Sequence, residues 1–427
     1  MSKRIKIRAG AAAAIAGAVA FLSMGCAPGT GSGTGQAAGS VTLKVWGWRP
    51  EDAATYSKIF KLYEDSHPGV KVDYVPYTST EYDTILSTGI KDSSGPDVAQ
   101  LRSYGLLQPL VQSGSLVPLD GLPGLSTFPK AVLDGARGVD DNKVYGVPFA
   151  IQTLHVLYNK DTFQKLGITP PATWNDMMAD FAMIKSDGQV PLAATVTDTW
   201  MLPIEQEIFG AGTYGGTKYL DEMLSGQAKF TDEPWVNSLK AWLSTEPYWG
   251  ENYKGTSYTD AQALFTSGKA ATFPGGIFEL AGFRKANPKL NIGIFNVPAP
   301  DGSGTPVPGY VDGSFGVSKA SAHQKQALDL VKWMSTAQFG QAFSDDLSQI
   351  SPVPGVTPKD PLLAQAVQAY AADPSPYVTY AYFSNGTPTG WDLASRSFSS
   401  LVLGQISPEA AADQIQHGVN QWFKPQS

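Results

Sequence analysis

The sequence has few of the residues that cross-link chains or bind metals. Its 427 residues include one cysteine, Cys26, and four histidines, none of which lies within four residues of another. A single thiol forms no disulfide within the chain, so the hydrophobic core has to supply the stability. Metal ligands normally occur as clusters of His, Cys and carboxylates, so we expect no metal site and no cofactor.

Basic residues are scarce as well. Lys and Arg total 31 against 38 Asp and Glu, which gives a net charge of −7. Residues 1–25 carry four of the basic residues and no acidic one, so their removal makes the net charge −11. A protein that binds nucleic acid needs a basic surface to neutralise phosphates, so we expect no nucleic-acid partner.

The apolar run near the start of the chain is too short for a membrane helix. It extends from Ala9 to Leu22, and at about 1.5 Å per residue it does not cross a hydrocarbon core of about 30 Å. It follows four basic residues and ends just before Cys26. This arrangement predicts a signal peptide over residues 1–25. Residues 26–40, mostly Gly, Ser, Thr and Ala, predict a flexible tether.

The end of this segment resembles a bacterial lipoprotein signal, in which the cysteine becomes the first mature residue and carries lipid. One position departs from the pattern, because Ser23 stands three residues before Cys26 and Leu22 lies one further back. The resemblance implies that Cys26 is lipid-modified and holds the protein on the outer face of the cell membrane. The alternative is ordinary secretion with an incidental cysteine.

The pattern changes to strand, helix and strand after the tether. Apolar residues alternate with polar ones over 41–45 and again over 70–74. Between these stretches, apolar residues recur at helical spacing until Pro68 and Gly69 end the helix: Tyr56, Ile59, Phe60 and Tyr63. A unit of this kind is a right-handed parallel crossover, so we expect an α/β fold.

A second α/β segment is expected from about Val144 onward. Tyr145 to Asn159 read as extended, and Thr173 and Asp176 have the spacing of a capping box at the start of a helix. One hydrophobic core normally holds no more than roughly 250 to 300 residues, so a chain of this length predicts two lobes.

Aromatic and polar side chains gather at the expected strand ends and turns, where an open α/β sheet forms its cleft. Aromatic rings stack on the apolar faces of sugars, while carboxylates, amides and guanidinium groups bind hydroxyls, so this mixture favours a carbohydrate. The candidates are Trp46, Trp48, Arg49, Glu51, Asp97, Arg102, Tyr104, Trp200, Phe278 and Trp391. Four other tryptophans, at helical spacing, are assigned to packing: Trp174, Trp242, Trp333 and Trp422.

No catalytic motif is evident, and we expect no catalytic residues. Asp312 to Gly316 come nearest to a serine nucleophile elbow but lack its first glycine. Adjacent acids such as Asp140 and Asp141 mostly face solvent, although two distant acids can still meet in a cleft. A secreted glycoside hydrolase therefore stays open as the alternative function.

From about Val41 to Phe423 the chain resembles extracellular solute-binding protein family 1, the substrate-binding lipoproteins of carbohydrate ABC importers, which include maltose-binding proteins. The order and spacing of several short stretches carry the resemblance. These stretches are 41–48, 96–105, 144–149, 158–160, 171–174, 264–276 and 312–317.

The resemblance implies a two-lobe, periplasmic-binding-protein-like fold of type II with three crossings between the lobes, which bends at a hinge around its ligand. The crossings are expected near Phe149 to Thr153, Thr272 to Gly275 and Gly316 to Lys319. The first lobe is then 41–150 plus 273–317, and the second is 151–272 plus 318–427.

The implied function is capture of a mono- or oligosaccharide, without catalysis, and its delivery to an ABC transporter permease. The protein is expected to be an extracytoplasmic monomer, and the lipoprotein start is typical of Gram-positive members. Within the family pattern, Trp391 matches a sugar-stacking tryptophan, Phe278 stands where relatives often have Trp, and Asp97, Gln152 and Asp312 fall at cleft positions. An adhesin or sensor module with the same fold is a third possibility.

The charge of the sugar is left open by the sequence. Arg49 and Arg102 could bind the carboxylate of a uronate bidentately, or they could pair with Glu51 or Asp97.

Overall fold

The strand, helix and strand at the start of the fold form as the sequence predicts. β1 (Val41–Gly47) and β2 (Val70–Pro76) pair in parallel, with α1 (Ala53–Ser66) between them. The four apolar residues at helical spacing in α1 are buried, which confirms the expected inner face. The computed structural model describes residues 40–425. The expected signal peptide, Cys26 and all of the expected tether except Ser40 lie outside these residues.

One mixed sheet runs through the described part of the chain in the order β2-β1-β3-β8-β4-β6-β5. β7 pairs with β4, and β9 pairs with β8. The β1 to β3 and β5 to β6 pairs are parallel, whereas β4 and β8 run antiparallel to each other. The remaining strands are β3 (Val98–Arg102), β4 (Val147–Asn159), β5 (Val190–Leu192), β6 (Ala270–Gly276), β7 (Ile292–Phe295), β8 (Val307–Val317) and β9 (Pro374–Pro376).

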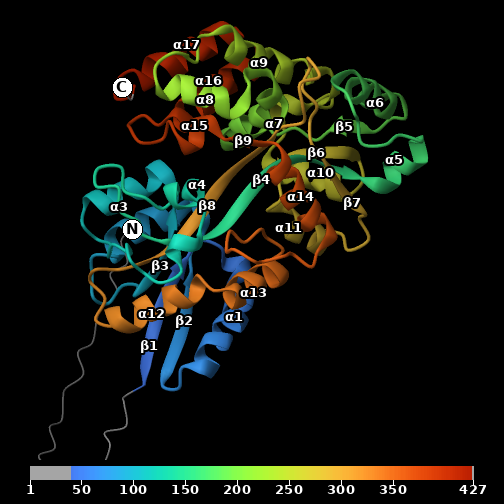
Figure 1. The fold of residues 1–427 in the computed structure, drawn as a ribbon. Helices are drawn as coiled ribbons and strands as arrows, with labels where there is room; N and C mark the ends of the chain where they lie inside the picture. Colours follow the sequence, from blue (N-terminus) through green and yellow to red (C-terminus); the bar gives the residue numbers. More distant parts are fainter. Residues whose placement is uncertain (1–39, 426–427) are drawn as a thin grey trace, which may run out of the picture. The chain divides into compact units, whose positions relative to one another are not determined.

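Two hydrophobic cores divide this sheet, and β4 and β8 pass from one to the other (Figure 1). In β4, Val147 to Ala150 belong to the first core and Leu154 to Leu157 to the second, while Ile151 packs against both. In β8, Tyr310 packs against both cores and Val311 lies in the first. The fold is therefore α/β with two lobes, as expected.

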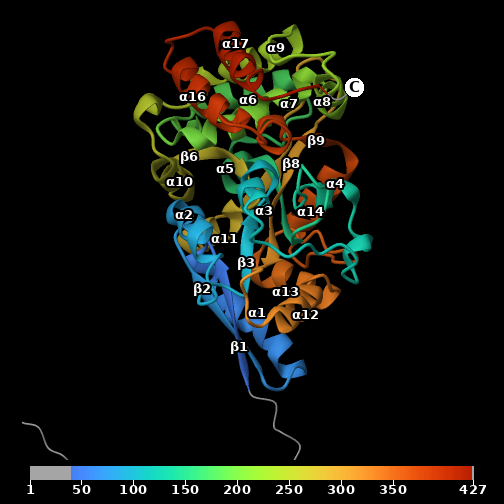
Figure 2. The same cartoon turned by 90° about the vertical axis from the view of Figure 1, so that its left-hand side faces the viewer.

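Helices of the first lobe surround β1 to β3. These elements are α1, α2 (Ser79–Gly89), α3 (Gln108–Gln112), α4 (Lys130–Asp134), α12 (Gln324–Met334) and α13 (Ala337–Leu347), with the 3-10 turns η1 (Pro50–Asp52), η2 (Tyr104–Leu107) and η3 (Leu125–Thr127). In Figures 1 and 2, α12 and α13 lie beside α1 and β1, far from α16 and α17.

The second lobe is the more helical one. It contains α5 (Lys160–Leu166), α6 (Trp174–Ser186), α7 (Leu202–Tyr214), α8 (Gly216–Leu224), α9 (Glu233–Leu243), α10 (Tyr258–Thr266), α11 (Glu279–Ala286), α14 (Pro361–Ala372), α15 (Val378–Ala381), α16 (Gly390–Val402) and α17 (Pro408–Val419), with the 3-10 turns η4 (Thr199–Met201), η5 (Glu246–Tyr248) and η6 (Tyr253–Gly255). The expected capping box of α6 is present, because Thr173 Oγ1 accepts from the Asp176 amide and the Asp176 carboxylate accepts from the Thr173 amide.

The cores divide the chain differently from the expected lobe boundaries. Phe273, Leu280 and Ile294 lie in the second core, although we expected residues 273–317 in the first lobe. Leu330 and Phe343 lie in the first core, although we expected 318–427 in the second lobe. The reason is that α12 and α13 pack against the first lobe, and the chain returns to the second lobe only after α13.

Two of the three segments that join the lobes therefore differ from those we expected. The one expected near Phe149 to Thr153 lies within β4, but Thr272 to Gly275 belong to β6, which pairs with β4 and β5 inside the second lobe. β8 crosses before Val311, ahead of the expected Gly316 to Lys319. The third crossing is the segment 348–360, where Ile350 forms a bridge with Ile151.

Candidate functional site

A pocket of about 1110 Å³ lies between residues of the two lobes. Its first-lobe side comes from the carboxyl ends of strands, because β1 and β3 are parallel and end at the same edge. Trp48 and Arg49 follow β1, and Arg102 is the last residue of β3. The first turns of α2, with Ser79, Thr80 and Asp83, complete this side.

Arg49 is held by two carboxylates of its own segment. Its Nε donates to Asp52 Oδ2 over 2.6 Å, and its Nη2 lies 3.2 Å from Glu51 Oε1. Burial acts to lower the pKa of Arg49, but Asp52, Glu51 and Asp312 outweigh it and raise that pKa. Burial raises the pKa of Asp52 against the opposing effect of Arg49. The result is a compact ion cluster at the pocket wall.

Arg102 is fixed by α2 and by an aromatic ring. Its Nε lies 3.2 Å from Asp83 Oδ1, and its Nη2 donates to Ser79 Oγ over 2.9 Å. The guanidinium carbon lies 4.2 Å from the centre of the Trp48 ring, which is a cation–π contact. Trp48 itself is buried and packs against Tyr82 and Phe149. One face of its ring is therefore covered by Arg102.

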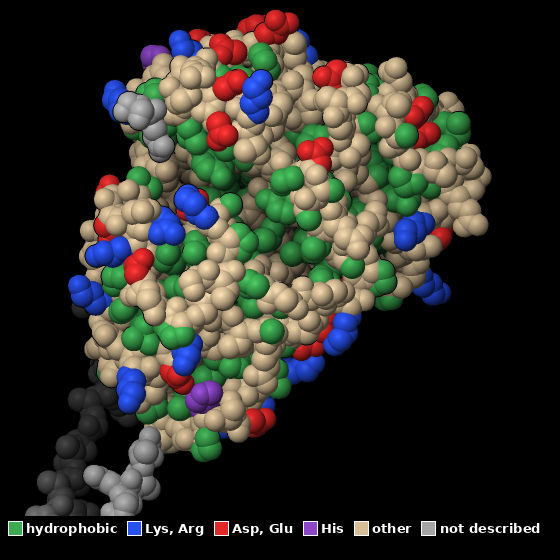
Figure 3. Space-filling view, in the orientation of Figure 1, with side chains coloured by type: hydrophobic (Ala, Val, Ile, Leu, Met, Phe, Trp, Pro, Cys, Tyr) green, Lys and Arg blue, Asp and Glu red, His purple; other side chains and the backbone are tan. Residues whose placement is uncertain are grey.

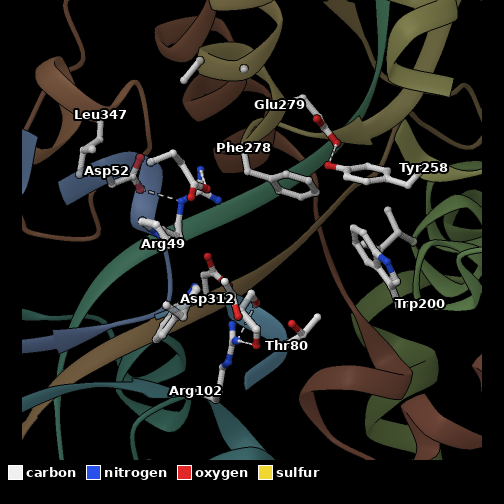
Figure 4. Close-up of a pocket in the computed structure, with 18 of the residues that line it drawn as sticks. Arg49, Asp52, Thr80, Arg102, Trp200, Tyr258, Phe278, Glu279, Asp312 and Leu347 are labelled. Carbon is white, nitrogen blue, oxygen red and sulfur yellow. Dashed lines mark hydrogen bonds and ion pairs between the residues drawn. The ribbon is translucent and has the colours of Figure 1, made fainter. Parts of the chain in front are cut away.

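Asp312 projects from β8, and its carboxylate is oriented by a buried amide. Gln152 Nε2 donates to Asp312 Oδ2 over 2.9 Å and to Gln349 Oε1 over 3.1 Å. Gln152 thus connects β4 with the other two crossings. In Figure 4, Asp312 lies between Arg49 and Arg102.

The second-lobe side of the pocket is aromatic. In Figure 4, Trp200, Tyr258 and Phe278 lie together opposite Arg49 and Arg102. Trp200 and Tyr258 meet edge to face with ring centres 4.9 Å apart. We call the following pocket-lining residues the aromatic wall: Trp200, Tyr258, Phe278, Tyr310, Tyr377, Tyr380 and Trp391.

One carboxylate lies beside the aromatic wall. Glu279 is buried at the start of α11, where Tyr258 Oη donates to its Oε1 over 2.6 Å and Gln262 Nε2 donates to its Oε2 over 2.9 Å. Burial raises the pKa of Glu279 to about 7, against the opposing hydrogen bonds from Tyr258 and Gln262. Near neutral pH this group changes between an acid and a carboxylate.

Eight of the twelve residues predicted for the site line this pocket. They are Trp48, Arg49, Glu51, Arg102, Trp200, Phe278, Asp312 and Trp391. Gln152 does not line it, but its Nε2 donates a hydrogen bond to Asp312, which does.

The other three predicted residues lie elsewhere. Asp97 precedes β3, at the end of the strand away from the pocket, and its buried carboxylate accepts from the Lys44 amide and from Ser321 Oγ. Trp46 packs on Tyr77 with ring centres 5.0 Å apart. Tyr104 is buried and lines a second pocket of about 550 Å³. We expected Asp97 at a strand end that faces the cleft, but it lies at the opposite end of β3 from the pocket.

Sequence reasoning missed several pocket residues on helix starts and turns. Tyr258 and Glu279 are the first residues of α10 and α11. Tyr377 directly precedes α15, and Tyr380 lies within it. The run of tyrosines over 377–382 was the one available signal. Nothing local to the sequence places Tyr258 beside Glu279, because 20 intervening residues fold back to bring them together.

Among residues 40–425 there is no group of three His, Cys, Asp or Glu side chains placed to hold a metal ion. No helix in that range has the length and apolarity to cross a membrane. His155 is buried and bonded to Thr153 and Asn296, which fits a structural histidine. In Figure 3 acidic and basic side chains are interspersed over the visible face.

A family comparison matches most of this fold. Residues 46–341 fit the family model described as bacterial extracellular solute-binding protein. The chain is also 28% identical over 315 residues to the multiple sugar-binding protein of Streptococcus mutans, covering 71% of this chain and 73% of that protein. The mannitol-binding protein of Pseudomonas aeruginosa is 25% identical over 250 residues, which is 55% of each chain.

Solved structures share the fold at low sequence identity. RafE from Streptococcus pneumoniae, in its apo form, has a TM-score of 0.74 at 21% identity and covers 90% of this chain and 99% of its own. The GacH receptor of Streptomyces glaucescens, which was also solved with acarbose, has a TM-score of 0.73 at 22% identity, with coverages of 89% and 97%.

Proposed function

Because this chain belongs to the bacterial extracellular solute-binding protein family, we propose that it captures a mono- or oligosaccharide in the pocket between its lobes and delivers it to the permease of an ABC importer. The observation that carries the proposal is the pairing of an aromatic wall with a polar first-lobe side across one pocket. The sugar-binding name of the Streptococcus mutans relative supports the same reading.

The two sides suit the two surfaces of a sugar ring. The aromatic wall offers ring faces to the C–H face of a pyranose, and Phe278 and Trp391 are both half-buried and so retain contact area. Across from them, Asp312, Asp83 and Thr80 offer acceptors and a hydroxyl for the sugar's own hydroxyl groups. Ligand sites of this kind combine apolar walls with a few placed polar groups.

We propose that binding occurs without turnover. A glycoside hydrolase needs two carboxyl groups that face each other across the scissile bond, one of them held as an acid. Burial raises the pKa of Glu279 to about 7, which would suit such an acid. However, both of its oxygens already accept hydrogen bonds, one from Tyr258 and one from Gln262. The hydrolase is the second candidate, and it predicts products that the receptor does not.

A thermal-shift screen over mono- and oligosaccharides tests the proposal. A sugar present at 100 times its dissociation constant adds about 2.7 kcal/mol to the stability, which is readily seen in a melting curve. The sugar that stabilises most is then incubated with the protein and recovered by chromatography. The proposal predicts stabilisation and an unchanged sugar. Stabilisation with new reducing ends identifies a hydrolase, and no stabilisation by any sugar contradicts carbohydrate capture.

The protein works outside the cytoplasm, as its family does. We further propose that Cys26 carries lipid and anchors a monomer to the outer face of the membrane of a Gram-positive cell. The sole thiol of the chain, at the end of a signal-like segment and before a Gly- and Ser-rich stretch, supports this placement.

A further inference from the structure

Charged side chains around the pocket bear on the charge of the ligand. Acidic residues outnumber basic ones among those that line it. The acids are Glu51, Asp52, Asp83, Glu279, Asp312 and Asp346, and the bases are Arg49, Arg102 and Lys285. Asp346 is already paired with Lys58 over 2.8 Å, and Lys285 is exposed, where water and salt screen its charge.

In both arginines the side-on fork, formed by Nε and Nη2, already has partners within the protein. A carboxylate or phosphate is bound bidentately when two parallel N–H groups of a guanidinium point at it. Arg49 uses Nε and Nη2 on Asp52 and Glu51, and Arg102 uses Nε and Nη2 on Asp83 and Ser79. One face of the Arg102 guanidinium also lies against Trp48.

The first-lobe side consequently carries more negative than positive charge. Two guanidinium groups stand among four carboxylates, namely those of Glu51, Asp52, Asp83 and Asp312. Among residues 40–425 Asp312 forms no ion pair, and its one side-chain hydrogen bond comes from the neutral amide of Gln152. On the opposite side, Glu279 is bound by the neutral groups of Tyr258 and Gln262.

We propose that the ligand of this pocket is an uncharged carbohydrate, and that Asp312 together with the closed Arg49 and Arg102 ion pairs excludes sugar acids and sugar phosphates. This inference rests on the proposed function and decides the question that the sequence left open. An entering carboxylate would face Asp312 as a like charge, or would displace Asp52 from Arg49 and leave a buried carboxylate without its partner. A hydroxyl group meets neither obstacle, since it donates to Asp312 and accepts from arginine.

Calorimetric titration with matched sugar pairs tests this directly. The pairs are galactose with galacturonate, glucose with glucuronate, and glucose with glucose 6-phosphate, extended to the oligosaccharide that stabilises the protein most and its oxidised, acid-ended form. We expect the acid or phosphate member to bind at least about 100-fold more weakly than its neutral partner. An acid that binds as tightly as its neutral partner overturns the inference and leaves the proposed function standing. Failure of every neutral and acidic sugar to bind overturns the proposed function itself.

Two variants assign the discrimination to named residues. Asp312→Asn removes one charge with little change of shape, and Asp83→Asn releases Arg102 from an exposed partner on α2. Each should lower the ratio of acid to neutral dissociation constants at least about tenfold. Asp65→Asn, an exposed position on α1 outside the pocket, is the matched control and should leave the ratio unchanged. Asp83 is exposed, so Asp83→Asn should fold. It keeps the test decisive if Asp312→Asn does not fold. An unchanged ratio in the folded variants overturns the assignment.

Discussion

Gln152 Nε2 donates to Asp312 Oδ2 over 2.9 Å, and the same amide donates to Gln349 Oε1 over 3.1 Å. These residues stand on the three segments that join the lobes, so one buried side chain links every crossing. Gln152 therefore ties the Asp312 carboxylate and the segment 348–360 to the same point of β4.

Replacement of Gln152 should therefore affect both stability and binding. Gln152→Leu leaves Asp312 and Gln349 without a donor and should lower the free energy of unfolding by about 1–3 kcal/mol. Gln152→Glu adds repulsion toward Asp312 and should lower it further. Denaturant unfolding of the wild type and both variants gives the order directly. Equal stability of the three proteins would show that the hydrogen bonds of Gln152 contribute little.

Trp391 is expected to be a stacking surface rather than a core residue. It is half-buried at the start of α16 and meets Tyr380 edge to face with ring centres 6.3 Å apart. Trp391→Ala should weaken sugar binding by about 1–3 kcal/mol and change the melting temperature of the unliganded protein little. Trp174→Ala, a half-buried tryptophan on α6 outside the pocket, serves as control and should leave the affinity unchanged. A large loss of melting temperature in Trp391→Ala without ligand would place it in the core.

Glu207 should make the stability depend on pH. Burial raises its pKa from 4.5 to about 8, against hydrogen bonds from Tyr214 and from the Val378 amide. Because the folded protein then holds this proton more tightly than the unfolded chain, the stabilising contribution is complete below about pH 4.5 and is lost as the pH rises toward 8.

Glu207→Gln keeps the shape and removes the titration. Between pH 5 and 8 the free energy of unfolding of the wild type should fall by about 1–4 kcal/mol more than that of the variant. Glu233→Gln, exposed on α9, is the control and should follow the wild type. Parallel curves for the wild type and Glu207→Gln would mean that Glu207 does not take up a proton on folding.

Cys26 should be the lipid-bearing first residue of the mature protein. Cys26→Ser should release the protein into the medium, because no other thiol in the sequence can take its place. Cell fractionation and mass spectrometry of the mature N-terminus give the answer. Retention of Cys26→Ser on the membrane, with no lipid on the wild type, would contradict the anchor.

Local patterns in the sequence predicted the fold well where the structure is local. β1, α1 and β2 are set by alternation and helical spacing over adjacent residues, and the α6 capping box by two residues three apart. The crossings were harder, because they depend on pairing between β4 and β8, about 160 residues apart in the chain. Pro274, Gly275 and Gly276 are residue types that favour a turn, but they lie in β6, where their backbone pairs with β4.

In the candidate site, too, positions set by nearby residues could be predicted, whereas contacts between distant residues could not. Trp48 and Arg49 could be placed because they follow the predicted first strand. Arg102 was expected near a strand end, and it is the last residue of β3. Their ion pairs could not be assigned. Arg102 pairs with Asp83 on α2 rather than with Asp97, since Asp97 lies at the other end of β3. From the sequence, either Asp83 or Asp97 could pair with Arg102. The direction of β3 determines which of the two lies beside it.

The central claim is that a sugar binds between the aromatic wall and the first-lobe side of the larger pocket. A crystal structure of the complex with the most stabilising sugar tests it most directly. We predict electron density for one sugar in that pocket, with a ring face against Phe278, Trp391 or another ring of the aromatic wall and hydroxyls within hydrogen-bond distance of Asp312. Density for the sugar outside this pocket, for instance in the smaller one beside Tyr104 and Trp422, would contradict the account.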